Sequence, residues 1–283
     1  MVKVLDSGFY STIQDTGRLD FQEFGVPVSG VMDVYSSKIA NAIVSNDEND
    51  AVLEITMTGP ELEFGNSALI GLSGANISPM LNGKSVSMNT AISLSRGDIL
   101  SFGKLVYGFR AYLAISGGFQ TKEVLGSRSM CKNLTNRISI IKGDILDIQE
   151  LNKYKETNNA SIKIDKTHFE NNVIEVFKGP EFDKLTNSQV KQLLTQEFTI
   201  AKENSRMAYQ LKESLDNDLD SIITSLVLPG SVQLTPSGKL IILMRDCQTT
   251  GGYPRVLQLK ESSINRLSQK FTGQSIKFQL IHS

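Results

Sequence analysis

The feature that most constrains the fold is a series of short runs rich in β-branched and aromatic residues. Gly, Asn or Asp separate these runs at intervals of about ten residues, a spacing typical of strands and turns. The runs cover residues 51–57, 67–72, 91–94, 99–102, 109–115, 139–141, 173–177, 197–201, 231–234, 240–244, 256–259 and 276–281. Strands at this density favour barrels or sandwiches over a βαβ layout. We therefore predict a mainly β protein with a few helices.

Three segments are predicted to be helices. The first spans 34–44 and follows Asp33, a residue type that caps helix N-termini well. Its apolar face is predicted to consist of Tyr35, Ile39, Ala42 and Ile43. The second would be capped by Asn187 or Ser188, and the third covers 261–270. Each is expected to close the end of a barrel.

A polar stretch divides the chain into two halves. Residues 151–166 contain few apolar side chains, which indicates a linker or an excursion. The total of 283 residues suits two modest domains. We predict one β-barrel module over 1–150, the linker over 151–166 and a second module over 167–283.

Composition excludes several classes of function. A formal net charge of −1 gives no field that favours nucleic acid or an anionic membrane. No apolar run approaches the ~20 residues of a membrane span, and the N-terminus lacks the apolar core of a signal peptide. The two cysteines, Cys131 and Cys247, are expected to be reduced in a cytoplasmic protein.

Metal and histidine chemistry are not expected. The only histidines are His168 and His282, and neither belongs to a zinc-binding spacing. His168 lies in a polar stretch that we interpret as a solvated loop. No GxxxxGK[ST] motif occurs, so any nucleotide site differs from a P-loop.

Residues 248–255 form the most informative polar segment, Gln-Thr-Thr-Gly-Gly-Tyr-Pro-Arg. The adjacent Gly251 and Gly252 would let backbone N–H groups face a ligand. Thr249 and Thr250 add hydroxyls, and the Arg255 guanidinium suits a carboxylate or phosphate. A simple turn between two strands is the alternative interpretation.

A second polar cluster lies near the N-terminus. Asp15 and Arg18 are three residues apart across a glycine, so the carboxylate could hold the guanidinium, in a functional loop or a surface pair. Ser29 and Gly30 belong to a tight turn before Asp33, which opens a helix whose N-terminus favours anions. Asp33 could equally be only the cap.

Further candidates lie between these clusters. Glu54 interrupts an apolar run, so it either faces solvent, which is the default, or is buried with a partner, where it could act as a general base. Ser127, Arg128 and Ser129 indicate either an anion clamp or a capped turn. Cys247 has no histidine placed to deprotonate it and is interpreted as inert.

Taken together, these motifs resemble one family. They are Gln14-Asp15-x-Gly17-Arg18, Gly25-Val-Pro-x-Ser29-Gly30-x-Met32-Asp33, Leu53-Glu54, Gly59-Pro60, Ser73-Gly74-Ala75, Gly117-Gly118-Phe119, Gly126-Ser127-Arg128-Ser129, Pro229-Gly230-Ser231, Gln233, Pro236-x-Gly238 and Asp246-x-Gln248-Thr-Thr-Gly-Gly-Tyr-Pro-Arg255. The ordered set is similar to the KipA, or allophanate hydrolase subunit 2-like, family, which is associated with the C subunit of bacterial 5-oxoprolinase. A related region forms part of biotin-dependent urea carboxylase.

The resemblance implies two cyclophilin-like β-barrels and a place in a complex. The partners would be KipI-type and LamB/YcsF-type subunits, and the complex would use ATP to open 5-oxoproline to L-glutamate. One alternative is a carboxyltransferase that acts on a urea-like amide, with biotin carried by a partner. Another is a KipA-type regulator that binds a KipI-type kinase inhibitor without catalysis.

We expect a catalytic set and a substrate-binding set. The catalytic set is Asp15, Arg18, Glu54, Arg128 and Arg255. The binding set is Gln14, Ser29, Gly30, Asp33, Asn41, Gly74, Ala75, Ser127, Ser129, Gln248, Thr249, Thr250, Gly251, Gly252 and Tyr253. Segments 14–18, 127–129 and 248–255 are expected to complete one cleft.

The chain departs from the family pattern at several positions. Cys247 stands where the pattern has Arg. Ala208 and Gln210 replace Gly and Arg in a run usually written SxRMGxRL, and Met130 replaces a common Thr. Two expected guanidinium groups are therefore missing from the second half, a loss that modestly favours the regulatory alternative.

Overall fold

The computed structural model describes residues 1–149 and 164–281, which fold into two compact units. The first consists of Met1–Arg18 and Ser29–Phe169, and the second of Leu19–Val28 and Glu170–Ser283. Most of the expected linker, 151–166, lies outside the described residues. The prediction of a mainly β chain with a few helices is confirmed, whereas the domain boundaries chosen from the sequence stay a prediction.

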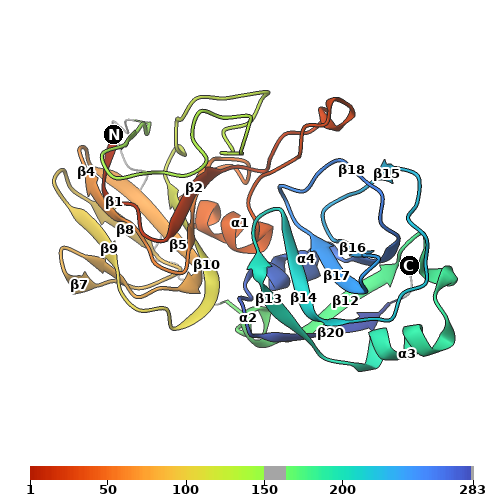
Figure 1. The fold of residues 1–283 in the computed structure, drawn as a ribbon. Helices are drawn as coiled ribbons and strands as arrows, with labels where there is room; N and C mark the ends of the chain where they lie inside the picture. Colours follow the sequence, from red (N-terminus) through yellow and green to blue (C-terminus); the bar gives the residue numbers. More distant parts are fainter. Residues whose placement is uncertain (150–163, 282–283) are drawn as a thin grey trace. The chain divides into compact units, whose positions relative to one another are not determined.

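The first unit contains two antiparallel sheets (Figure 1). The six-stranded sheet has the order β11 (Ile145–Leu146), β1 (Val2–Asp6), β4 (Glu61–Phe64), β9 (Ile99–Phe102), β6 (Pro79–Leu81) and β7 (Lys84–Ser85). The five-stranded sheet has the order β2 (Tyr10–Gln14), β3 (Val52–Thr56), β10 (Tyr107–Ile115), β5 (Ala68–Asn76) and β8 (Ala91–Leu94).

The five-stranded sheet is covered on both faces. One face shares an apolar core with the six-stranded sheet, where Leu53 and Ile55 of β3 pack with Val4 and Leu62. Helix α1 (Val34–Ile43) covers the other face, next to β5 and β10. Every residue of β3 is therefore buried, including the polar ones.

Helix α1 differs from its predicted face. Asp33 caps it as expected, because its side chain accepts a hydrogen bond from the Ser36 N–H. Ile39 and Ile43 pack against the sheet as predicted, but Tyr35 and Ala42 are exposed, so the predicted apolar face is only half correct. The buried residues are Ser36, Ser37, Ala40, Asn41 and Ile43. Small side chains allow α1 to approach the sheet so closely that a Cβ at Gly71 would lie 2.7 Å from the Ala40 carbonyl oxygen.

The second unit is built on a closed barrel. Its strand order is β12 (Val173–Lys178), β19 (Arg255–Leu259), β16 (Ser231–Leu234), β17 (Lys239–Leu243), β14 (Ala208–Ser214), β13 (Phe198–Asn204) and β20 (Ser275–Leu280). Two helices, α3 (Asn187–Thr195) and α4 (Glu261–Ser268), accompany it (Figure 1). A separate pair of short strands joins β15 (Ser225–Leu226) to β18 (Thr250–Gly251).

Two local predictions are wrong. Thr186, not Asn187 or Ser188, caps α3, because it forms a reciprocal capping box with Gln189. Residues 139–141 form no strand, and the Ile140 N–H instead donates singly to the Ser11 carbonyl. No helix in the part of the chain that the structure describes is both long and apolar enough to cross a membrane.

Candidate functional site

The buried carboxylate of Glu54 is the centre of the first unit's polar site. Strand alternation turns Leu53 and Ile55 into the core between the sheets and Glu54 toward α1. Only 1% of Glu54 is exposed, so the expectation that it faces solvent is wrong and the buried alternative is confirmed. In the sheet register it lies opposite Tyr112 of β10.

Glu54 is held by defined hydrogen-bond donors. Its Oε2 accepts from the Met32 N–H at 2.7 Å and from the Tyr112 hydroxyl at 2.9 Å. Its Oε1 lies 3.8 Å from Nε of Arg110, which is also buried. A buried carboxylate requires such partners, because desolvation otherwise disfavours its charged form.

Tyr112 links Glu54 to the start of helix α1. Its hydroxyl oxygen accepts the Asp33 N–H at 2.8 Å while its proton goes to Glu54. Burial, with added repulsion from the Glu54 and Asp33 carboxylates, raises the pKa of Tyr112 well above 10.0. The phenol therefore stays protonated and serves as a fixed donor.

Asp33 does more than cap α1. Its Oδ1 accepts the Ser36 N–H at 3.2 Å and its Oδ2 accepts the Ser36 hydroxyl at 2.6 Å. Oδ2 also lies 2.8 Å from Nε2 of His168. Because a carboxylate only accepts, Nε2–H of His168 is the donor.

His168 is not in a solvated loop, and that prediction is wrong. It lies on the short helix α2 (Thr167–Glu170), and only 12% of its side chain is exposed. Its ring is 4.8 Å from the Tyr35 ring and 5.0 Å from the Phe169 ring, measured between centroids. The surrounding sequence is polar, and the partner Asp33 is 135 residues away, so no local signal marked this contact.

We call Glu54, Tyr112, Asp33 and His168 the carboxylate–histidine site. It forms a chain of contacts in which Tyr112 links the Glu54 carboxylate to the Asp33 backbone, and the Asp33 carboxylate holds the His168 imidazole. Imidazole and carboxylate groups held in this way are suited to proton transfer. The sequence identified Glu54 and Asp33, and it missed Tyr112 and His168.

Asp15 organises a second cluster of the first unit. Its Oδ1 accepts the hydroxyls of Ser127 and Ser129 at 2.6 Å each, and the Gly17 N–H at 2.8 Å. Its Oδ2 accepts the Arg128 N–H at 2.6 Å. Both serine hydroxyls therefore donate to Asp15, an arrangement that favours the capped-turn interpretation. Their role in binding a substrate stays a prediction.

Two arginines fasten the same loop. Arg18 is fully buried and donates from Nε to the Val124 carbonyl at 3.0 Å and from Nη2 to the Ser129 carbonyl at 2.5 Å. Arg128 donates to the Thr121 carbonyl and to Gln120, and pairs with Glu123 at 3.1 Å. Asp15 and Arg18 thus each form their own hydrogen bonds to the 124–129 segment.

The remaining first-unit candidates have structural roles in their immediate surroundings. Gln14 donates to Thr12 and the Met130 carbonyl, and Asn41 donates to the Asp50 carbonyl. A Cβ at Gly74 would lie 2.5 Å from the Arg110 carbonyl oxygen, so close backbone packing explains this glycine, and Ala75 is buried beside it.

Ser29 is the exception. It has a left-handed φ of 59°, immediately before Gly30 at 86°, and its buried hydroxyl has no hydrogen-bond partner among the described residues. Backbone strain and an unsatisfied buried hydroxyl both destabilise the folded protein. We therefore expect Ser29 to have a functional role that a substitution can test.

Arg255 of the second unit is held by Glu181. Its Nε and Nη2 donate to the two carboxylate oxygens at 3.0 and 2.9 Å, and Nη1 donates to the Leu226 carbonyl at 2.7 Å. Hydrogen bonding by Arg255 lowers the pKa of Glu181, and the same pairing raises the pKa of Arg255. This fork geometry is bidentate and rigid.

The 248–255 segment forms part of a small sheet. Thr250 and Gly251 pair with Leu226 and Ser225. The carbonyls of Thr249 and Gly252 accept the N–H groups of Val227 and Ile222. The predicted ligand contacts of Gln248 through Tyr253 stay a prediction, as does the composite cleft.

Cys247 is 3% exposed, and burial raises its pKa to about 12. The protonated thiol is a poor nucleophile, which agrees with the inert interpretation. In the described residues, no group of three or more His, Cys, Asp or Glu side chains is placed to hold a metal ion.

Comparison with known proteins identifies the family. Residues 24–280 match the family described as carboxyltransferase domain, subdomain A and B. The chain belongs to this carboxyltransferase domain family. The resemblance found in the sequence motifs is thereby confirmed.

Relatives of this carboxyltransferase domain are parts of enzymes. The chain is 31% identical over 286 residues to the C subunit of the Escherichia coli 5-oxoprolinase, a match that covers 98% of this chain and 90% of that protein. It is 44% identical over 128 residues to the urea amidolyase of Lachancea kluyveri, covering 45% of this chain and 7% of that protein. The solved urea carboxylase of Kluyveromyces lactis has a TM-score of 0.89 at 27% identity, covering 99% of this chain and 27% of that one.

Proposed function

We propose that this chain is a subunit of an ATP-dependent 5-oxoprolinase complex that opens 5-oxoproline to L-glutamate. The observation that carries the proposal is the similarity to the C subunit of 5-oxoprolinase, which extends over 98% of this chain and 90% of that protein. A match that covers nearly all of both chains supports a shared place in an assembly.

The carboxylate–histidine site supplies groups that lactam opening needs. The amide of 5-oxoproline is unreactive, and ATP would supply activation of its oxygen. The attacking water must then lose a proton, a task for His168 held by Asp33 or for Glu54. Tyr112 keeps the Glu54 carboxylate oriented, since its own proton is retained.

The complex is proposed to contain two further subunits. These are of the KipI type and of the LamB/YcsF type, as the sequence resemblance implies. The bacterial relatives are themselves named as subunits, which supports the need for partners.

The test is reconstitution. The chain is co-expressed with candidate KipI-type and LamB/YcsF-type subunits, and glutamate and ADP formation from 5-oxoproline and ATP are measured. Matched preparations each omit one of the three proteins. Stoichiometric glutamate and ADP that depend on this chain would support the proposal. A stable complex without turnover would contradict it and favour the KipA-type regulatory alternative.

Carboxyl transfer is the second candidate function. The description of the matched family and the 44% identity to a urea amidolyase region favour it. In that case a partner would carry biotin, and the acceptor would be a urea-like amide. Transfer of labelled bicarbonate to urea in the presence of a biotin-carrying partner and ATP would distinguish it from hydrolysis of 5-oxoproline.

A further inference from the structure

A cavity of about 250 Å³ opens beside the Asp15 cluster, within the first unit. Its walls come from the segment 121–137 and from strand β11. None of the carboxylate–histidine site residues lines it. It is therefore a candidate binding site separate from the carboxylate–histidine site, on the same unit.

The cavity carries an excess of positive charge. Lys122, Arg128 and Arg137 line it against a single carboxylate, Asp144, which gives a formal charge of 3 − 1 = +2. Asp144 is already engaged, because its Oδ1 lies 3.2 Å from Nη2 of Arg137 and its Oδ2 accepts the Ile141 N–H. Glu123 outside the lining offsets one further charge through Arg128.

Two of the three cations keep donors available. Among the described residues, the Lys122 ammonium has no hydrogen-bond or ion-pair partner, and Arg137 uses only Nη2. Arg128, in contrast, is fastened to Thr121, Gln120 and Glu123. An anion entering the cavity would therefore meet Lys122 and Arg137.

Apolar side chains form the rest of the cavity wall. Val124, Met130 and Leu146 line the cavity, and Leu146 is buried. A free inorganic anion would gain nothing from these side chains, whereas a small ring or short alkyl body would bury apolar surface there. The volume fits only a compact molecule.

We propose that this cavity binds a compact monocarboxylate whose carboxylate meets Lys122 and Arg137 while its apolar body contacts Val124 and Met130. Identification of that ligand as 5-oxoproline rests on the proposed function. The bound lactam would occupy a site distinct from the carboxylate–histidine site, as a loading or regulatory position.

Binding to the full chain tests the ligand class directly. Calorimetric titration uses 5-oxoproline, cyclopentanecarboxylate, uncharged 2-pyrrolidone and inorganic phosphate. We expect both carboxylates to bind at least tenfold more tightly than 2-pyrrolidone and phosphate. Equal binding of 2-pyrrolidone would exclude the role of the cations, and equal binding of phosphate would exclude the apolar walls; either result overturns the proposal.

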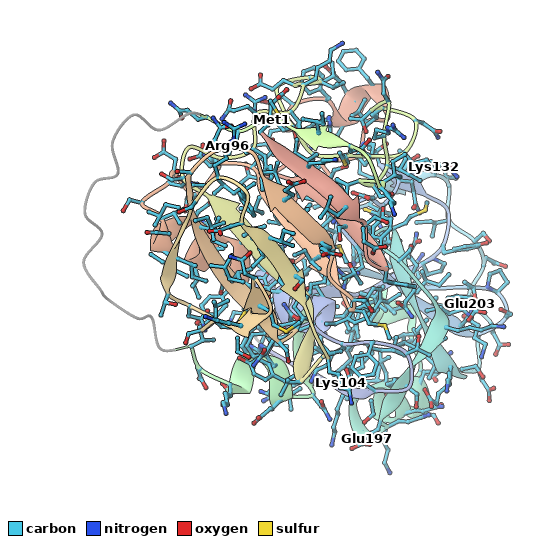
Figure 2. The ribbon with its side chains drawn as sticks, turned by 90° about the vertical axis from the view of Figure 1, so that its left-hand side faces the viewer. Met1, Arg96, Lys104, Lys132, Glu197 and Glu203 are labelled. Carbon is cyan, nitrogen blue, oxygen red and sulfur yellow. The ribbon has the colours of Figure 1, made fainter. Side chains whose placement is uncertain are left out.

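Variants locate the site. Lys122→Gln should fold normally, because its ammonium forms no hydrogen bond or ion pair with the described residues, and adding Arg137→Gln should raise the Kd at least tenfold. The control is Lys104→Gln with Lys132→Gln, which removes the same charge from two exposed lysines outside the cavity (Figure 2). Equal Kd values for the two double variants would overturn the proposal.

The outcomes separate this inference from the proposed function. One result would be carboxylate binding that depends on Lys122 and Arg137, without turnover in the reconstituted complex. It would support the binding site in the cavity and contradict the proposed 5-oxoprolinase activity. The opposite result would be turnover without carboxylate binding to the chain, with a KM for 5-oxoproline that the double variant does not change. That result would support the 5-oxoprolinase activity and contradict carboxylate binding in the cavity.

Discussion

Nε2 of His168 lies 2.8 Å from Oδ2 of Asp33, although 135 residues separate them in the chain. Asp33 is fully buried and also caps helix α1. The contact therefore attaches α2 to the N-terminus of α1 and gives the buried carboxylate a charge-capable partner. Tyr35 and Phe169 flank the imidazole and limit its motion.

Replacing His168 by Ala should destabilise the first unit. The Asp33 carboxylate would lose a donor in a fully buried position, at a cost of about 1–3 kcal/mol. Urea unfolding followed by circular dichroism measures this. Lys166→Ala, at an exposed position of the same segment, is the control and should change stability by less than about 0.5 kcal/mol. Equal stability of the two variants would contradict a role for the Asp33 contact.

Glu54 is expected to matter for chemistry as well as for folding. Glu54→Gln removes a buried charge, and if the carboxylate takes part in proton transfer, turnover in the reconstituted complex should fall by roughly 100-fold or more. Its pH–rate profile should also change shape. Glu61→Gln, at the exposed first residue of β4, removes the same charge and should leave turnover unchanged.

Tyr112→Phe separates orientation from proton transfer. The variant keeps the Glu54 carboxylate but leaves it and the Asp33 N–H each without one partner. We expect a loss of about 1–3 kcal/mol in unfolding free energy and a much smaller loss of turnover than for Glu54→Gln. Equal turnover losses in the two variants would mean that Glu54 acts through structure alone.

Ser29→Gly should stabilise the protein. Glycine adopts the left-handed φ of 59° without the cost of roughly 1–2 kcal/mol that an L side chain incurs, and it removes an unsatisfied buried hydroxyl. The greater freedom of glycine in the unfolded chain offsets part of this gain, so about 1 kcal/mol is expected. A gain in stability together with a loss of turnover would indicate that the hydroxyl contacts substrate.

Ser78→Gly is the matched control for Ser29. Ser78 also has a left-handed φ, of 52°, but its hydroxyl donates to the Lys104 carbonyl at 2.9 Å. Loss of that hydrogen bond should cancel much of the relief of strain. A stability gain as large as that of Ser29→Gly would show that the unsatisfied hydroxyl contributes nothing.

Strand content could be predicted from the sequence because it depends on local pattern. The runs at 91–94 and 99–102 coincide with β8 and β9. The burial of Glu54 could not be predicted, because alternation along β3 cannot show that α1 covers its second face. The exposure of Tyr35 could not be predicted for a related reason, because the sequence of α1 does not show that the side bearing Ala40 and Ile43 meets Gly71 of the sheet.

The site was only partly accessible to sequence reasoning. Motifs singled out Asp33 and Glu54, but chemistry that depends on long-range pairing, as between Asp33 and His168, has no local signature. Serine hydroxyls at 127 and 129 suggested an anion clamp, and the structure shows that both donate to Asp15. The sequence indicates that these two hydroxyls form hydrogen bonds, but only the fold shows that their partner is Asp15.

Cys247 should make the protein less stable at high pH. The ordinary pKa of the thiol is 9.0, and burial raises its pKa in the folded state to about 12. Because the folded state holds the proton more tightly, the stabilisation is fully present below pH 9 and is lost as pH rises toward 12. At pH 10 the unfolded thiol is mostly ionised, which corresponds to a loss of about 1.4 kcal/mol.

Comparison with Cys247→Ala isolates this effect from other groups that titrate at high pH. The unfolding free energy of both proteins is measured in urea at pH 7.5 and at pH 10, and the decrease between the two values is compared. Alanine cannot ionise, so the variant should lose about 1.4 kcal/mol less than the parent across this interval. Cys131→Ala, at the other buried cysteine, tests whether any thiol has the same effect. Identical decreases in the parent and in Cys247→Ala would mean that the Cys247 thiol ionises as readily in the folded protein as in the unfolded chain.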